Sequence, residues 1–208
     1  MAAKTAEKTK RSVGGHPTNE RAAEIAGAVV AATMQAFAES GADFSMDEVA
    51  ALAGVSKQAI YRRWKSKTDL IIETIDSVLA DGFAVPDVTH SDSVMELRET
   101  AWHLFDTDLS VAHRVNIFLQ AEALREERIS SRLLEWRGRF LAVYRHGLRA
   151  IEHDSRRENG DISLQAEILM ELLSGASSML AITGAVSDED KRRAFDERWV
   201  SFCRIAIR

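Results

Sequence analysis

The first strong pattern in the chain is a series of apolar residues spaced three or four positions apart between residues 19 and 40. This spacing places them on one side of an α-helix, so it predicts a helix from about Thr18 or Asn19 to Ser40 with one buried face. Gly41 follows directly, where a residue that accepts a left-handed backbone commonly ends a helix. The apolar positions are Ala22, Ile25, Ala26, Val29, Val30, Met34 and Phe37.

Three short helices are predicted next, each from its own start signal. Ser45 followed by Glu48 is a capping box, in which each side chain bonds the backbone of the other residue. Ser56 is suited to cap the following helix after a turn at Gly54, and Ser66 to cap the one after that. The predicted helices end near residues 53, 64 and 81.

The rest of the chain predicts five longer helices separated by short polar gaps. The chain has only two prolines, Pro17 and Pro86, and shows no strand-like alternation with turn dipeptides. Ser93 and Glu96 form a second capping box after Pro86. Short gaps favour antiparallel neighbours in a bundle, so the fold class is all-α with about nine helices. The five helices are expected near 93–109, 112–128, 131–153, 162–184 and 188–206.

These elements suggest four segments along the chain. Residues 1–17 are polar and basic without an apolar core, which predicts a disordered tail and not a secretory signal. The expected units after it are a helix-turn-helix domain at 18–66, a linking helix at 67–85, and a ligand-binding and dimerisation domain at 86–208.

The segment from Phe44 to Leu70 has the pattern of a helix-turn-helix, in which two short helices cross after a tight turn. Small residues, Ala50 and Gly54, lie where the helices would approach. The residues expected to face inward are Val49, Leu52, Ala53, Val55, Ile60 and Trp64.

Charge singles out the same segment. The net charge is −5, yet residues 55–67 hold five basic residues and no acidic one. Such a stripe on an acidic protein indicates a surface for a polyanion, or simply a solvated helix face. Charge alone does not separate these two interpretations.

The second helix of this motif carries side chains that suit base edges and phosphates. Lys57 can donate to guanine, Gln58 can pair with adenine, and Ala59 can touch a thymine methyl group. The candidate DNA-binding residues are Ser45, Ser56, Lys57, Gln58, Ala59, Tyr61, Arg62 and Lys67. Alternatives remain for several of them: Ser45 and Ser56 are also caps, and Gln58 can be plain solvated surface.

Residues 18–75 resemble the N-terminal domain of the TetR family of bacterial repressors. The likeness is carried by Val49–Lys57 and Ile60–Leu70, which are similar to the family signature over nearly its whole length. The resemblance implies three helices that bind DNA and a fourth that links them to a regulatory domain. It also implies that Ser56–Ala59 and Tyr61 face DNA and that Lys67 contacts a phosphate. Gln58 and Trp64 depart from the family pattern, which usually has a small residue and a phenylalanine there.

Beyond about residue 82 the resemblance implies only an all-helical, ligand-responsive, dimeric domain. The last two predicted helices are expected to form a four-helix interface between two subunits, although they can instead complete the monomer core. The interface candidates are Leu172, Gly175, Met179, Phe195, Trp199 and Phe202. The candidates for an effector pocket are Trp102, His103, Phe105, Phe118, Glu122, Trp136, Phe140, Tyr144 and Met170.

Several other classes of protein find little support. The sequence has no Gly-rich phosphate loop, recognisable nucleophile pair or zinc ligand set, so we expect neither an enzyme nor a cofactor. His146 and His153 are too far apart in sequence to share a metal on one helix face. The single cysteine, Cys203, and the lack of an apparent run of about 20 apolar residues favour the cytoplasm over a membrane.

The function expected is a dimeric, DNA-binding transcriptional regulator that reads a palindromic operator. We expect a repressor that an unknown small-molecule effector releases from double-stranded DNA. The alternative is a helical ligand-binding or scaffolding protein without a role at DNA.

Overall fold

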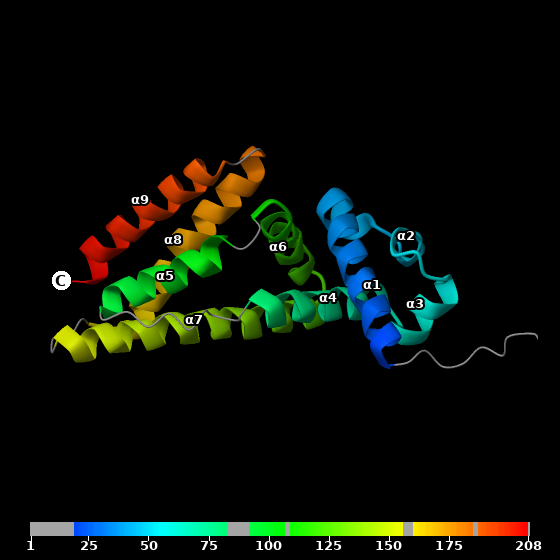
Figure 1. Cartoon of the computed structure of the whole chain (residues 1–208), viewed down its shortest axis with the longest axis horizontal. Coiled ribbons are helices and arrows are strands. Elements are labelled where there is room, and N and C mark those ends of the chain that lie inside the picture. The colour runs from blue at the N-terminus through cyan, green and yellow to red at the C-terminus, as the bar shows by residue number, and fades with distance from the viewer. Residues whose placement is uncertain (1–18, 83–91, 107–108, 156–159, 185–186, 208) are drawn as a thin grey trace, which may run out of the picture.

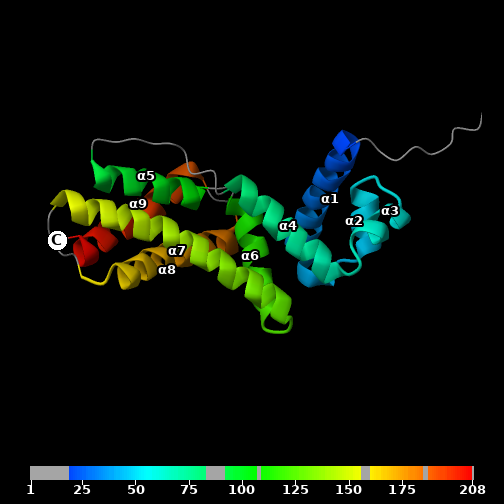
Figure 2. The same cartoon turned by 90° about the horizontal axis from the view of Figure 1, so that it is seen from below.

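The computed structural model describes residues 19–82, 92–106, 109–155, 160–184 and 187–207, and within these ranges it is all-helical (Figure 1). Helices α1 to α4 lie at one end of an elongated molecule, α5, α8 and α9 lie at the other, and α7 runs beneath both (Figures 1 and 2). The elements are α1 (Asn19–Ser40), the short 3-10 helix η1 (Gly41–Asp43), α2 (Met46–Leu52), α3 (Lys57–Arg63), α4 (Lys67–Gly82), α5 (Ser93–Asp106), α6 (Leu109–Ala123), α7 (Glu127–Ser155), α8 (Ile162–Thr183) and α9 (Asp188–Ala206).

The first four helices form where the sequence predicts them, because their end signals are local. The Ser45 hydroxyl accepts from the Glu48 amide at 3.1 Å, and the Glu48 carboxylate accepts from the Ser45 amide at 3.4 Å. Ser56 caps α3 by accepting from the Ala59 amide at 3.2 Å. The turn glycine Gly54 has a φ of 65°, a left-handed value that L residues adopt reluctantly.

Two helix starts in the second half differ from the sequence prediction. The cap of α5 is Asp92 and not Ser93, since the Asp92 carboxylate accepts from the Val94 amide at 2.9 Å. Helix α7 begins at Glu127, so the gap expected at residues 129–130 is wrong. Ile129 is 1% exposed and packs inside the protein, which a gap residue would not do. Glu126 ends the true gap and receives the Arg128 amide on its side chain at 3.3 Å.

Apolar side chains gather in two cores. The N-terminal core joins α1, α2, α3 and α4 to α6 and to the beginning of α7; it includes Phe37, Ile60, Leu70, Val115 and Ile129. The C-terminal core joins α5, the rest of α7, α8 and α9. Helix α4 is therefore an integral part of the N-terminal core, and α6 bridges toward the second half. The tail expected at 1–17 lies outside the described residues.

Helix α8 corrects one reading of the sequence. Its 22 residues, Ile162–Thr183, are long and apolar enough to cross a membrane by length and composition alone. It packs against α7 and α9, and Leu169, Met170 and Leu173 are buried in the C-terminal core. The helix serves as a core helix of this bundle.

Candidate nucleic-acid interface

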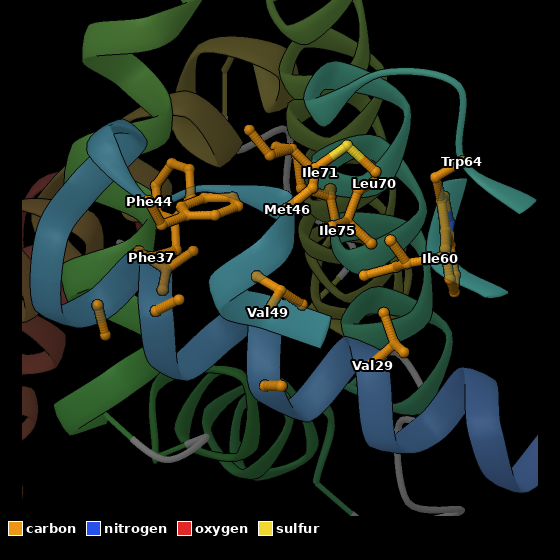
Figure 3. Packing of buried hydrophobic residues seen from close by; sticks show 14 of the residues in the cluster. Val29, Phe37, Phe44, Met46, Val49, Ile60, Trp64, Leu70, Ile71 and Ile75 are labelled. Carbon is orange, nitrogen blue, oxygen red and sulfur yellow. The ribbon is translucent and has the colours of Figure 1, made fainter. Parts of the chain in front are cut away.

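Helices α2 and α3 cross through an apolar contact that holds their outer surfaces in place. Val49 of α2 and Ile60 of α3 are fully buried, and Trp64, which ends α3, is 2% exposed (Figure 3). Burying one such side chain stabilises a protein by roughly 1.5–3 kcal/mol. Leu52 does not join them: it is 47% exposed, because it lies on the outer side of α2, so its expected inward position is wrong.

The opposite side of α3 is open to solvent. Lys57, Gln58 and Arg62 are exposed, and the Tyr61 side chain is 48% exposed although it is aromatic. Ala59 is half-buried between these residues and Ile60. The exposed caps, Ser45 and Ser56, stand at the starts of α2 and α3. The structure thus leaves the predicted base-reading residues on an unobstructed helix surface.

Lys57 is tied to the start of α2 by an ion pair. Its ammonium donates to Asp47 at 2.5 Å, and both side chains are largely solvent-accessible. The hydrogen bond to Asp47 and its negative charge raise the pKa of Lys57 above the ordinary lysine value. The bond joins the N-terminal ends of the two helices, and it competes with any other acceptor that Lys57 could reach.

Lys67 is placed differently from a plain surface lysine. Its half-buried ammonium donates to the carbonyls of Ala42 and Phe44, the latter at 3.3 Å, and lies 5.3 Å from the centre of the Phe44 ring. These bonds fasten the start of α4 to the connection between α1 and α2. An ammonium has three N–H groups, so one remains for a phosphate oxygen.

A further polar cluster supports the end of α3, and the sequence did not reveal it. The Trp64 indole N–H donates to Glu73 at 2.7 Å, and Arg63 donates to the other carboxylate oxygen at 2.5 Å. Trp64 can use this partner where a phenylalanine could not. Glu73 comes nine residues later on another helix, and no sequence spacing marks such a contact.

The family model described as bacterial regulatory proteins, tetR family, matches residues 29–74, from the middle of α1 through most of α4. These residues contain the complete crossed pair of helices and its support. The chain belongs to the TetR family.

One curated relative of this TetR-family chain is the DNA-binding transcriptional repressor TetR of Mycobacteroides abscessus, 49% identical over 51 residues. That alignment covers 24% of this chain and 27% of the relative, so the match spans about a quarter of each protein.

Solved structures resemble nearly the whole chain in fold. A TetR transcription regulator from Haloarcula marismortui aligns with a TM-score of 0.74 at 16% identity, covering 88% of this chain and 97% of that one. A TetR-family structure from Rhodococcus sp. also gives 0.74 at 18% identity, covering 86% and 98%. At such identities the likeness concerns the fold alone.

The expected pocket residues of this TetR-family chain do not meet around one space. Phe118 and Trp136 pack against the N-terminal core, whereas Phe105, Tyr144 and Met170 are buried in the C-terminal core. The remaining candidates are partly buried: Trp102, His103, Glu122 and Phe140. Burial raises the pKa of the Tyr144 hydroxyl far above its usual value, as for a phenol enclosed in apolar packing.

The expected interface residues fall into two groups. Phe195, Trp199 and Phe202 fill the C-terminal core of the monomer, with at most 6% of each exposed, which corrects their expected position on an outer face. Gly175 and Met179 are exposed on α8, and Leu172 is half-buried. Other large apolar residues share the outer surface of the two last helices: Leu164, Ile182, Val200 and Ile205.

Proposed function

We propose that this chain is a sequence-specific, DNA-binding transcriptional regulator that acts as a homodimer on a palindromic operator. We further propose that it is a repressor, released when a small-molecule effector binds. Its place of action is the cytoplasm, where the operator DNA is found. Membership in a family of regulatory proteins gives no support to a catalytic role.

The observation that carries the proposal is the two-sidedness of α3. One side packs through Ile60, while Lys57, Gln58, Tyr61 and Arg62 project from the other. A major groove about 12 Å wide admits one α-helix, whose first residues reach base edges. A helix held rigidly on one side and polar, cationic and exposed on the other suits this groove.

Within this proposal each candidate residue has a role that follows from its position. Lys57, Gln58 and Ala59, at the start of α3, read bases. The caps Ser45 and Ser56, with Tyr61 and Arg62, contact phosphates or the groove edge. Lys67 contributes its remaining N–H to a phosphate while it fastens α4 to the preceding turn.

A dimer is part of the proposal, because two recognition helices read half-sites about 34–36 Å apart or a multiple of this distance. The outer face of α8 and α9 supports it. This face exposes Met179 (58%), Ile182 (67%) and Ile205 (58%), which a monomer would leave in water. Gly175 on the same face allows a second helix to come close.

The deciding experiment is a selection from a random double-stranded DNA library with the purified full-length chain at low salt. We expect enrichment of a two-fold symmetric sequence, bound with an affinity that falls steeply as salt rises. Lys57→Ala and Gln58→Ala should change the enriched bases. Lys67→Ala should weaken all sequences alike, since it removes a phosphate contact and a support of α2.

Failure to retain any duplex would overturn the proposal and favour a ligand-binding or scaffolding bundle. Enrichment of an asymmetric site would contradict the dimeric part. A sequence-selective loss with Lys67→Ala would contradict the role given to that residue.

A further inference from the structure

A small cavity lies between the DNA-binding end of the molecule and its regulatory half. Its volume is about 40 Å³, and it is lined by residues of α1, α4, α6 and α7. Phe37 of α1 and Ile71 and Ile75 of α4, which line one side, are labelled in Figure 3. Val115 of α6 and Trp136 of α7 belong to the other side. None of the expected pocket residues except Trp136 lines it.

The lining excludes a charged ligand. None of its ten residues carries a charge, and most are apolar and buried. Its two threonine hydroxyls already donate to their own helices, Thr33 to the Val29 carbonyl at 2.7 Å and Thr74 to the Leu70 carbonyl at 2.8 Å. A charge placed here would lose its hydration without gaining a partner.

One donor in the lining is unused. The indole N–H of Trp136 is buried, and it has no hydrogen-bond acceptor in the described part of the chain. Buried polar groups are nearly always paired, so each exception calls for an explanation. A ligand with one acceptor oxygen would pair this N–H.

Volume limits the ligand further. The cavity exceeds the roughly 10–15 Å³ that one water molecule needs, and is well below the ~150 Å³ of an apolar cavity that takes up benzene in another protein. It therefore suits a molecule of only a few non-hydrogen atoms, and a larger one has to push the helices apart.

We propose that this cavity binds a small, uncharged molecule with an apolar body and one hydrogen-bond acceptor, such as a short-chain ketone, which accepts from Nε1 of Trp136. Because α1 and α4 carry α3, whereas α6 and α7 continue into the regulatory half, an occupant bears on both. Its effect on DNA rests on the function proposed above: occupancy shifts the two recognition helices and weakens operator binding.

Binding can be measured at the indole itself, without DNA. The ¹H–¹⁵N NMR spectrum of the ¹⁵N-labelled full chain should hold one indole signal for each of its four tryptophans, and Trp136→Phe identifies the relevant one. Titration with 2-butanone should shift that signal saturably, with a Kd on the order of millimolar for so few atoms. Propionate, which has the same size and shape but a negative charge, should leave it in place.

Two variants make this test specific. Val115→Leu adds a methylene group to the lining and should abolish the response of the Trp136 signal while the fold is kept. Trp102→Phe makes the same exchange as Trp136→Phe in the C-terminal core and should leave the response unchanged. A response to propionate, a response that survives in Val115→Leu, or no saturable shift with 2-butanone would overturn the site.

The link to DNA is tested separately with the operator found by selection. Saturating 2-butanone should weaken binding of the wild-type chain about 5-fold or more, and that of Val115→Leu not at all. If the ligand-free chain binds no DNA while Trp136 still responds, the proposed function fails and the binding site stands. If DNA binding is intact and indifferent to an occupied cavity, the regulatory link is overturned.

Discussion

At the scale of single residues, the exposed surface of α3 is not simply cationic. Asp47 holds the Lys57 ammonium at 2.5 Å, so the leading base-reading candidate already has a partner in the free protein. Exposed ion pairs of this kind are worth little in stability, which leaves Lys57 able to exchange partners. Asp47 also places a negative charge beside the surface that we propose for DNA.

Replacing Asp47 by asparagine should therefore strengthen DNA binding. Asp47→Asn keeps a hydrogen-bond acceptor near Lys57 but removes the competing charge, and we expect operator affinity to rise about 2- to 5-fold. Fluorescence anisotropy with labelled operator DNA measures this. In a Lys57→Ala background the same exchange should have a smaller effect. An equal gain in both backgrounds would mean that Asp47 acts by general repulsion and not through Lys57.

The Glu73 cluster leads to a prediction about stability. Glu73→Ala leaves the Trp64 indole N–H without its acceptor, and Trp64 is only 2% exposed. We expect the free energy of unfolding in urea to fall by about 1–3 kcal/mol. Arg63→Ala removes only an exposed ion-pair partner and should cost less, about 0.2–1 kcal/mol. If Glu73→Ala costs as much in a Trp64→Phe background, the indole bond is not the cause.

At the scale of elements, α7 is the long member that both cores share, and its two glycines differ in their surroundings. A Cβ added at Gly147 would lie 2.7 Å from Cδ1 and 3.2 Å from Cβ of Leu97, which is 1% exposed on α5. A Cβ at Gly138 would meet nothing within 4 Å. Gly147 thus allows α5 to approach α7, whereas Gly138 is an ordinary exposed helix position.

The two alanine variants should move stability in opposite directions. Gly147→Ala should lower the free energy of unfolding by about 1–2 kcal/mol, because overpacking against Leu97 outweighs the better helix propensity of alanine. Gly138→Ala should raise it by about 0.5–1 kcal/mol, because only propensity acts there. Urea unfolding followed by circular dichroism gives both values. Stabilisation by both exchanges would show that α5 is free to yield at Leu97.

The sequence predicts those parts of the fold that depend on neighbouring residues. The capping box of Ser45 and Glu48 and the left-handed turn at Gly54 could be read directly, because each is satisfied within a few residues. The apolar spacing of α9 was also read correctly. Spacing does not say what a helix face packs against, so Phe195 was expected between subunits although it fills the monomer core. The partner of Trp64 and the cavity at Trp136 depend on contacts between distant helices, which no local pattern encodes.

At the scale of the whole molecule, the functional proposal requires two copies held in a fixed relation. The C-terminal core of one chain is already filled by its own aromatic residues, so a partner has to use the outer face of α8 and α9. That face combines exposed apolar side chains with charged ones, including Asp190, Arg193 and Glu197, beside Met179. Helix α8 ends near the bridging helix α6, so a rigid pairing there would also fix the distance between the two α3 helices.

A charge placed at Gly175 tests this arrangement. The position is exposed and has open space around its Cα, so Gly175→Arg should leave the monomer fold and its helix content unchanged. Between two paired α8 helices the same side chain would be buried without a partner, which is strongly unfavourable. We expect light scattering after gel filtration to show half the mass of the wild-type particle. Operator affinity should fall about 100-fold or more, because each chain then binds a half-site alone. Gly138→Arg makes the same exchange on α7 and should keep both the mass and the affinity. A Gly175→Arg protein that remains a dimer would place the pairing surface elsewhere on the molecule.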